Sequence, residues 1–139
     1  MRKRESITKI MTKDTLTVHH GDSISKVRGI FEKNDVHHIP VVDGENLIGI
    51  ITWNDFMRIT FGDLPDQDVR NIDAILDHTY QLEDVMRKSP VTISKDGTIA
   101  EAAEILATGQ FHSLPVVDDT KLIGIVTSSD LIRYLAELY

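Results

Sequence analysis

Two stretches of the sequence decide the fold: HIPVVDGENLIGIITWND at residues 38–55 and SLPVVDDTKLIGIVTSSD at residues 113–130. They lie 75 residues apart, and the alignment runs without a gap from residues 11–58 onto residues 86–133. Of these 48 aligned pairs, 17 are identical. Agreement at this density indicates a duplicated structural unit, because internal similarity at a fixed period is the signature of repeat architectures.

Each repeat has the pattern of a β-α-β-β-α unit. Short strands are expected at residues 15–18 and 90–93, and an amphipathic helix follows each of them. These helices should end at Asn34 and Gly109, because both residue types tolerate the left-handed conformation that closes many helices. The two quoted stretches then predict β-hairpins around turns rich in Asp and Gly, and each hairpin runs into a last helix.

The duplication predicts an α/β (α+β) fold with pseudo-twofold symmetry. The first repeat, with an N-terminal segment, occupies residues 1–61, an acidic connector residues 62–81, and the second repeat residues 82–139. A single unit of this size buries too little apolar surface to be stable alone. We therefore expect the two repeats to pack face to face around a shared core and to form two equivalent clefts.

The composition excludes several classes of function. The chain has 139 residues, of which 41% are hydrophobic and 27% charged, and its net charge is −7, so neither nucleic acid nor a membrane is expected as a partner. It contains no cysteine, which removes thiol nucleophiles, disulfides and cysteine-ligated metals. There is no Walker loop and no serine-nucleophile elbow, so no enzymatic activity is expected. The absence of a signal peptide and of a long apolar run favours a cytoplasmic location.

A threonine stands where the second hairpin strand meets the last helix in both repeats. Thr52 is followed by Asp55, and Thr127 by Asp130. Each pair can be a simple helix capping box. Each can also bind a ligand, because a helix N-terminus attracts anions and a carboxylate beside it can accept both hydroxyls of a ribose. The residues alone leave both interpretations open.

The ordered pattern of the two quoted stretches, present twice at constant spacing, resembles a cystathionine-beta-synthase (CBS) domain pair, also called a Bateman module. The resemblance covers roughly residues 7–61 and 82–139. It implies two clefts between paired repeats that bind adenosine compounds: AMP, ADP, ATP, S-adenosylmethionine or, in some members, diadenylate messengers. It further implies a regulatory module, with AMP as the first candidate ligand.

The resemblance also implies which residues line the clefts. In such sites the Thr and Asp typically meet ribose and phosphate, and the segment ending at the strand proline frames the adenine together with the first strand. Carried onto this sequence, the first cleft uses Thr17, Val18, His38, Ile39, Pro40, Thr52 and Asp55. The second uses Thr92, Ile93, Ser113, Leu114, Pro115, Thr127 and Asp130. Arg133 is either a phosphate ligand of the second cleft or a surface ion-pair partner of Asp130.

Two further features of the sequence bear on the sites. Trp53 stands where the second repeat has Ser128, and it can line its cleft, plug it or be an exposed or interface aromatic. The doublets His19-His20 and His37-His38 suggest a metal, but adjacent side chains of a strand point to opposite faces. Each doublet should therefore offer a single ligand, and no metal site is expected.

The sequence thus favours a ligand-sensing regulatory module that acts on an unidentified partner protein. A structural or interaction pair without a bound nucleotide remains an alternative, as does a module that binds S-adenosylmethionine or a cyclic dinucleotide. A homodimer is also expected, because a small module should leave apolar residues of its last helices exposed. These residues are Phe56, Ile59 and Phe61 in the first repeat and Tyr134, Leu138 and Tyr139 in the second.

Overall fold

A computed structural model of the protein describes residues 4–62 and 69–139. The chain divides into two units, which are described separately. The N-terminal unit consists of residues 16–44 and 48–89, and the C-terminal unit of residues 4–15, 45–47 and 90–139. Both combine helices with short strands, which confirms the predicted α+β class.

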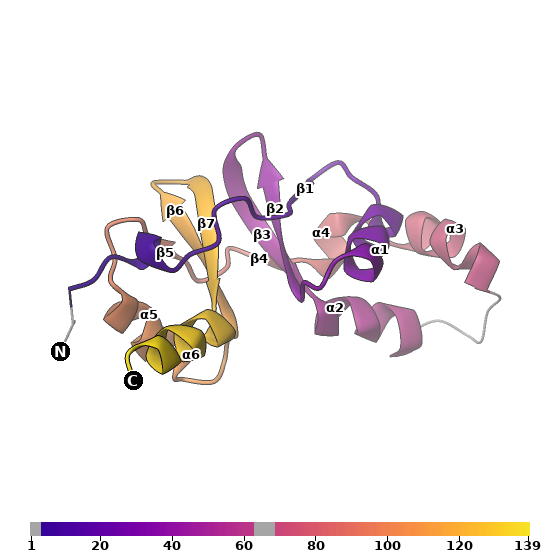
Figure 1. Ribbon diagram of the computed structural model, residues 1–139. Coiled ribbons are helices and arrows are strands. Elements are labelled where there is room, and N and C mark those ends of the chain that lie inside the picture. The colour runs from indigo at the N-terminus through magenta and orange to yellow at the C-terminus, as the bar shows by residue number, and fades with distance from the viewer. Residues whose placement is uncertain (1–3, 63–68) are drawn as a thin grey trace. The chain divides into compact units, whose positions relative to one another are not determined.

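The N-terminal unit holds most of the first repeat and the connector (Figure 1). Its elements are β1 (Val18–His19), α1 (Ile24–Lys33), β2 (His38–Asp43), β3 (Asn46–Thr52), α2 (Trp53–Met57), the π-helix η2 (Arg58–Gly62), α3 (Val69–Thr79), α4 (Leu82–Val85) and β4 (Arg87–Lys88). Strand β1 pairs in parallel with β2, with Val18 opposite Val41, and β4 pairs antiparallel with β3. Strand β2 has the predicted bounds, whereas β1 begins three residues later than expected.

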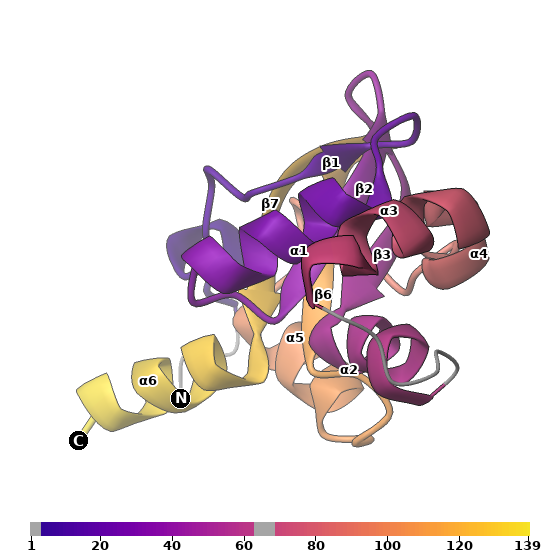
Figure 2. The ribbon, with the colours of Figure 1, turned by 90° about the vertical axis from the view of Figure 1, so that its right-hand side faces the viewer.

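Helix α3, which comes from the connector, lies beside α1 (Figure 2). The backbone N–H and the hydroxyl of Ser25 donate to the Asp77 carboxylate at 2.8 and 2.6 Å. Farther along, the Arg28 guanidinium donates to Asp73 at 3.2 Å. The connector is thus attached to the first repeat by polar contacts as well as by burial of Leu76.

The core of the N-terminal unit is built from alternate residues of the strands and from the inner faces of the helices. Its fully buried side chains include Val18, Ile24, Val27, Ile39, Val41, Ile51, Leu76 and Leu82. Phe56 and Ile59 also belong to this core, so the prediction that they stay exposed is wrong. Phe56 packs against the ring of Phe31, which α1 turns inward. The side chain of Phe61 lies outside the described part of the structure.

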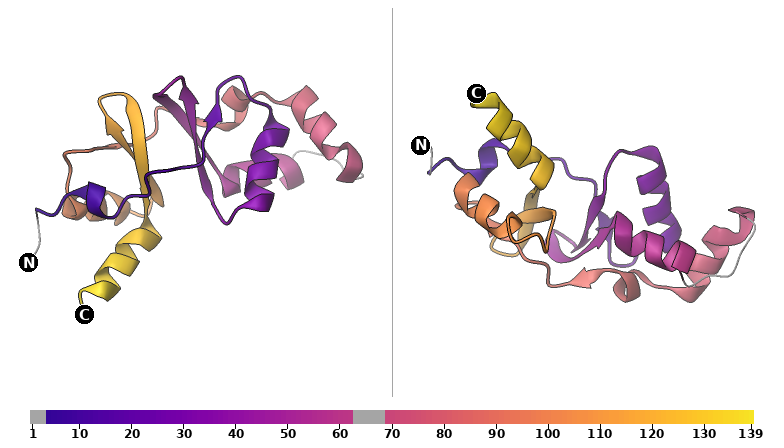
Figure 3. Two further views of the ribbon diagram at one scale, coloured as in Figure 1. Left: turned by 45° about the horizontal axis from the view of Figure 1, so that its top comes forward. Right: turned by 90° about the horizontal axis from the view of Figure 1, so that it is seen from below.

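The C-terminal unit repeats this arrangement. Its elements are the 3-10 helix η1 (Ile7–Lys9), β5 (Ile93–Ser94), α5 (Ile99–Leu106), β6 (Ser113–Asp118), β7 (Lys121–Thr127) and α6 (Ser128–Glu137). Strand β5 pairs in parallel with β6, and β6 forms an antiparallel hairpin with β7. Like β1, β5 begins three residues later than expected. Helix α6 continues from the end of β7 and extends beyond the hairpin (Figure 3).

The first part of each repeat, residues 7–12 and residues 82–87, packs in the unit formed by the other repeat; we call these two stretches the leading segments. In the C-terminal unit, η1 lies beside β5 (Figure 1), and the side chain of Ile7 is fully buried among Ile99, Leu114 and Val126. In the N-terminal unit, the aligned Leu82 is 1% exposed and packs in the core of that unit. The division into packed units therefore crosses the repeat boundaries, and the boundaries at 61/62 and 81/82 stay a prediction.

Two glycines make room for these leading segments. A Cβ atom on Gly124 would lie 2.8 Å from the Met11 sulfur and 2.8 Å from the Thr12 carbonyl oxygen. A Cβ atom on Gly49 would lie 2.6 Å from the sulfur of Met86. Because Met11 and Met86 are aligned in the repeat, the same close approach of strand and leading segment occurs in both units.

The two helix ends differ, although the sequence predicts the same conformation for both. Gly109 has φ +77°, which confirms the left-handed end of α5. Asn34 is extended with φ −132°, so that prediction is wrong at the end of α1. There the backbone N–H and the side-chain amide of Asn34 both donate to the Ile30 carbonyl, which satisfies it without a left-handed residue.

The start of α1 is capped by side chains. Ser23 accepts the Lys26 N–H at 3.3 Å, and the Asp22 carboxylate accepts the His19 N–H at 2.8 Å. The hydrogen bond from the Lys26 ammonium group, and then the bond from the His19 backbone, hold the pKa of Asp22 below its usual value of 3.8.

Among residues 4–62 and 69–139, no helix is both long and apolar enough to cross a membrane.

Candidate ligand-binding sites

The Thr-x-x-Asp junction of the N-terminal unit is a closed capping box. Thr52 accepts the Asp55 N–H at 3.1 Å, and Asp55 accepts the Thr52 N–H at 3.2 Å. The Asp55 carboxylate also accepts hydrogen bonds from Arg58 at 3.0 Å and from Arg87 at 3.3–3.4 Å. Its side chain is only 1% exposed. Both carboxylate oxygens are therefore used within the protein.

The junction of the C-terminal unit has the same box but a more open carboxylate. Thr127 accepts the Asp130 N–H at 3.2 Å, and Asp130 accepts the Thr127 N–H at 2.9 Å. One further bond comes from Arg133, at 3.1 Å, and the guanidinium side chain is itself 67% exposed. The Asp130 side chain is 15% exposed. The capping interpretation is thus confirmed at both junctions, and a carboxylate remains accessible at the second.

The difference between the junctions comes from the leading segments. Arg87 of β4 reaches Asp55, and the residue aligned with Arg87 is Thr12, whose short side chain carries no charge. Thr12 instead forms a pair of backbone hydrogen bonds with Ile125, at 2.8 and 3.0 Å. The N-terminal junction therefore has two arginines around its carboxylate, and the C-terminal junction has one.

The proline-containing strands begin next to the junctions. The backbone N–H of Trp53 donates to the His37 carbonyl at 2.8 Å, and that of Ser128 donates to the His112 carbonyl at 3.0 Å. In the C-terminal unit, Ser113 stands opposite Thr127 in the hairpin register. The structure thus places His37, the residue before His38, beside the first junction and Ser113 beside the second.

Several predicted site residues have their side chains in the cores instead. Ile39 and Leu114 are fully buried, and Pro40 and Pro115 are buried beside them. Val18 and Ile93 are also core residues. These residues can meet a ligand only through backbone atoms, whereas the partly exposed Thr17 and Thr92 can also offer their hydroxyls.

Trp53 packs within the N-terminal unit. Its ring meets that of Phe31 edge to face, with centroids 5.3 Å apart, and lies 6.2 Å from the ring of Phe56. The ring is thus partly buried and packs against the core cluster, so the expectation of an exposed aromatic is wrong.

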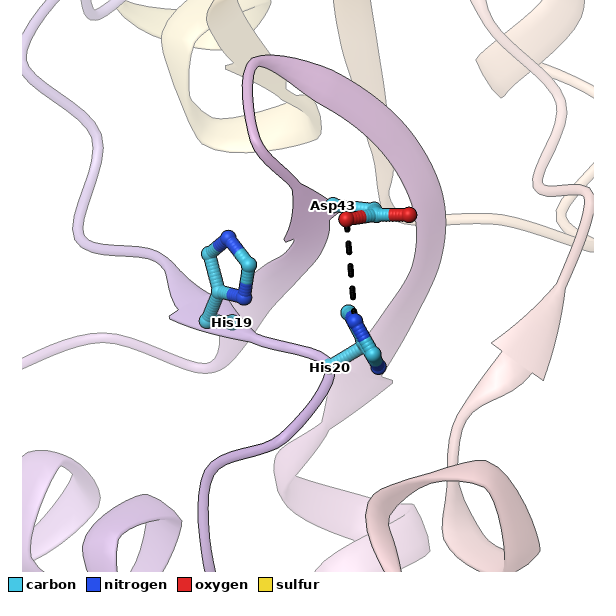
Figure 4. Close-up of side chains that lie close together, drawn as sticks. All are labelled: His19, His20 and Asp43. Carbon is cyan, nitrogen blue, oxygen red and sulfur yellow. Dashed lines mark ion pairs between the residues drawn. The ribbon is translucent and has the colours of Figure 1, made fainter.

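The structure also joins residues that the sequence analysis separated. The rings of His19 and His20 are 5.4 Å apart, and the side chains of both lie near Asp43 (Figure 4). These adjacent histidines do not point to opposite faces, because β1 ends at His19 and the chain turns immediately afterwards. The signal that could have revealed this was the Gly21-Asp22 pair, which is typical of a turn.

A groove of about 470 Å³ opens beside α1 and α3. Its lining is mostly polar and includes Ser25, Lys26, Lys33 and Asp73. None of the predicted site residues lines it, so it adds no support to the nucleotide interpretation.

Comparison with known proteins connects this geometry to a family. A model of the CBS domain matches residues 7–62 and 82–137. A CBS domain-containing protein of Dictyostelium discoideum is 30% identical over 95% of this chain and 92% of its own length. An uncharacterized protein of Methanocaldococcus jannaschii is 30% identical over 98% of this chain but only 33% of its own. The chain spans 33% and 48% of the length of the first two curated relatives it matches.

Solved structures show the same fold. The crystal structure of the Arabidopsis thaliana CBS-pair protein CBSX2 in complex with AMP has a TM-score of 0.79 and 25% identity, and the match covers 96% of this chain and 98% of that one. The CBS domain pair of protein MJ0100, in complex with 5′-methylthioadenosine and S-adenosyl-L-methionine, has a TM-score of 0.76 and 26% identity. That match covers 96% of this chain and 98% of the other.

Proposed function

Since this chain belongs to the CBS domain family, we propose that it is a regulatory module that senses an adenine nucleotide, with AMP as the first candidate. The observation that carries the proposal is the Thr127–Asp130 junction, a helix start whose carboxylate is still accessible. The AMP complex of CBSX2 supports the choice of nucleotide. The complex of the MJ0100 pair keeps S-adenosylmethionine as the second candidate.

The chemistry of the C-terminal junction suits a nucleoside phosphate. Thr127 uses an oxygen lone pair for the cap, so its hydroxyl hydrogen can be donated to a ribose or phosphate oxygen. Asp130 can accept both hydroxyls of a ribose, and the exposed Arg133 can turn from Asp130 towards a phosphate. In the first turn of the ten-residue α6, the N–H groups of Ser128 and Asp130 already donate to the His112 carbonyl and to Thr127, so only that of Ser129 is left to donate to a phosphate.

A ligand panel tests this proposal. We expect thermal shift and titration calorimetry to show which of these compounds binds: AMP, ADP, ATP, S-adenosylmethionine or a cyclic dinucleotide. A ligand at 100 times its dissociation constant stabilises the folded state by about 2.7 kcal/mol. If no compound stabilises the protein, the chain is a structural or interaction pair. Product analysis after incubation with ATP checks the proposed absence of catalysis.

We also propose that the module forms a homodimer in the cytoplasm and acts on a separate or linked protein. Helix α6 carries the exposed apolar residues Ile132 and Leu135, and two more, Leu138 and Tyr139, follow just beyond the helix. A second copy could cover these residues, since large exposed apolar patches are uncommon on monomers. Light scattering should give twice the chain mass of 15.7 kDa, and Leu135→Asp should return the value to 15.7 kDa. A mass of 15.7 kDa for the unchanged protein at micromolar concentration would exclude the dimer.

A further inference from the structure

The ends of β1 and β2 carry a cluster of two imidazoles and a carboxylate. The parallel pairing of these strands sets His19 opposite Val42, which brings the residues that follow each strand to the same edge. One ligand atom from each of His19, His20 and Asp43 lies within 4.8 Å of the other two (Figure 4). All three side chains are exposed, so an ion could reach them directly from solvent.

Backbone hydrogen bonds hold this cluster in place. The His20 N–H donates to the Val42 carbonyl at 3.0 Å, and the Asp22 N–H donates to the His19 carbonyl at 2.8 Å. The Gly44 N–H donates to Nε2 of His19 at 2.9 Å. That bond requires an unprotonated Nε2, so His19 presents a lone pair towards the loop that carries Asp43.

The second repeat has the same backbone without the imidazoles. The Lys95 N–H donates to the Val117 carbonyl at 2.8 Å, as His20 does to Val42. Lys95 then forms an ion pair with Asp118 at 3.2 Å, where the first repeat has His20 and Asp43 at 3.6 Å. Ser94 stands in the place of His19. The fold therefore does not require histidine at positions 19 and 20, and a lysine at position 20 would be sufficient for a surface ion pair with Asp43.

We propose that His19, His20 and Asp43 bind a divalent transition-metal ion of the Zn²⁺ class, with water completing the coordination. Imidazole nitrogen and carboxylate oxygen are ligands of Zn²⁺ at distances of about 2.0–2.2 Å. A tetrahedral site needs its ligand atoms about 3.3 Å apart, and Nε2 of His20 and Oδ1 of Asp43 are already 3.6 Å apart. Metal binding exchanges the Gly44 hydrogen bond of His19 for a coordination bond. The site is independent of the nucleotide proposal.

Zinc titration of the full chain tests the site. We expect calorimetry in a non-chelating buffer to show one Zn²⁺ per chain in the unchanged protein, and no comparable binding of Mg²⁺, which prefers oxygen ligands. His20→Lys copies the Lys95–Asp118 pair, so it should keep the fold while zinc affinity falls about tenfold or more. Circular dichroism checks that this variant is folded.

Two sets of variants separate the site from adventitious histidine binding. His78→Ala and His112→Ala change exposed histidines elsewhere and should bind Zn²⁺ like the unchanged protein. The double change Ser94→His and Lys95→His should add a second ion beside Asp118 and raise the stoichiometry to two. The proposal is overturned if His20→Lys binds like the unchanged protein, if His112→Ala loses as much affinity, or if the double variant gains none.

Discussion

The two Thr-x-x-Asp junctions have the same local sequence pattern and the same capping geometry, yet their carboxylates differ. Asp55 is 1% exposed and bonds to two arginines, whereas Asp130 is 15% exposed and bonds to one. The extra arginine, Arg87, lies 32 residues from Asp55 and arrives on the segment that leads into the other repeat. A repeat can thus keep its local motif while the segment that leads into the other repeat changes the burial and the hydrogen bonding of its carboxylate.

The largest effects should follow from detaching the leading segments. Ile7→Ala and Leu82→Ala each remove buried side-chain atoms, at an expected cost of about 2–5 kcal/mol in the free energy of unfolding. Urea denaturation measures this cost. Ile132→Ala, at a side chain that is 67% exposed, should change stability by less than about 0.5 kcal/mol. Equal losses for Ile7→Ala and Ile132→Ala would show that the first segment is not packed as described.

Adding a methyl group to Gly124 or Gly49 tests the same contacts, because each of these strand residues lies against a leading segment. Gly124→Ala and Gly49→Ala should each cost about 1–3 kcal/mol through overpacking, as measured by thermal melts. The larger loss is expected at Gly124, because a backbone oxygen lies 2.8 Å from the new Cβ against 3.0 Å at Gly49, and backbone moves less easily than methionine. Gly29→Ala is the control, since its Cβ would meet nothing within 4 Å. If Gly29→Ala destabilised the protein and Gly124→Ala did not, the close contact between Gly124 and the leading segment at Met11 and Thr12 would be contradicted.

Replacing the two aspartates separates binding from stability. Asp130→Ala removes charge-assisted hydrogen bonds to a ribose, worth about 1.5–3 kcal/mol each, so nucleotide affinity should fall at least tenfold. Asp55→Ala should weaken binding less and cost more stability, about 1–3 kcal/mol, because its carboxylate is buried and fully engaged. Calorimetry and melting curves on both variants measure the two quantities. If both only melt earlier and bind like the parent, the nucleotide assignment of these aspartates is wrong.

The smallest expected effect comes from exchanging the residues that distinguish the junctions. Arg87→Thr should leave Asp55 with Arg58 as its one arginine, as Asp130 has Arg133, and raise the affinity of the N-terminal junction about threefold, measured with Asp130→Ala also present to silence the other site. Stability should change by less than about 1 kcal/mol, because Arg87 is 56% exposed. Thr12→Arg is the reciprocal variant, and it should weaken binding at Asp130. Unchanged affinities in both variants would show that Arg87 does not control the first junction.

Much of the fold could be predicted from neighbouring residues. The hairpin strands His38–Asp43 and Ser113–Asp118 have the predicted bounds, and both threonines cap their helices, because alternation, turn residues and capping pairs act over a few positions. The prediction for Asn34 was wrong since an amide side chain can satisfy the helix end in another way. The prediction that Phe56 and Ile59 stay exposed was wrong, because the sequence of an apolar helix face does not show whether that face packs against the rest of the protein or is exposed to solvent.

By itself the sequence determined the duplication, the order of elements in each repeat and the position of the two Thr-x-x-Asp junctions. Only the tertiary structure decided that each leading segment packs with the other repeat, that Arg87 holds Asp55, and that His19, His20 and Asp43 meet. The physical reason is the range of the interactions. Caps and turns form between residues a few positions apart, whereas these contacts join residues 23 or more positions apart through strand pairing and core burial, which no local spacing records.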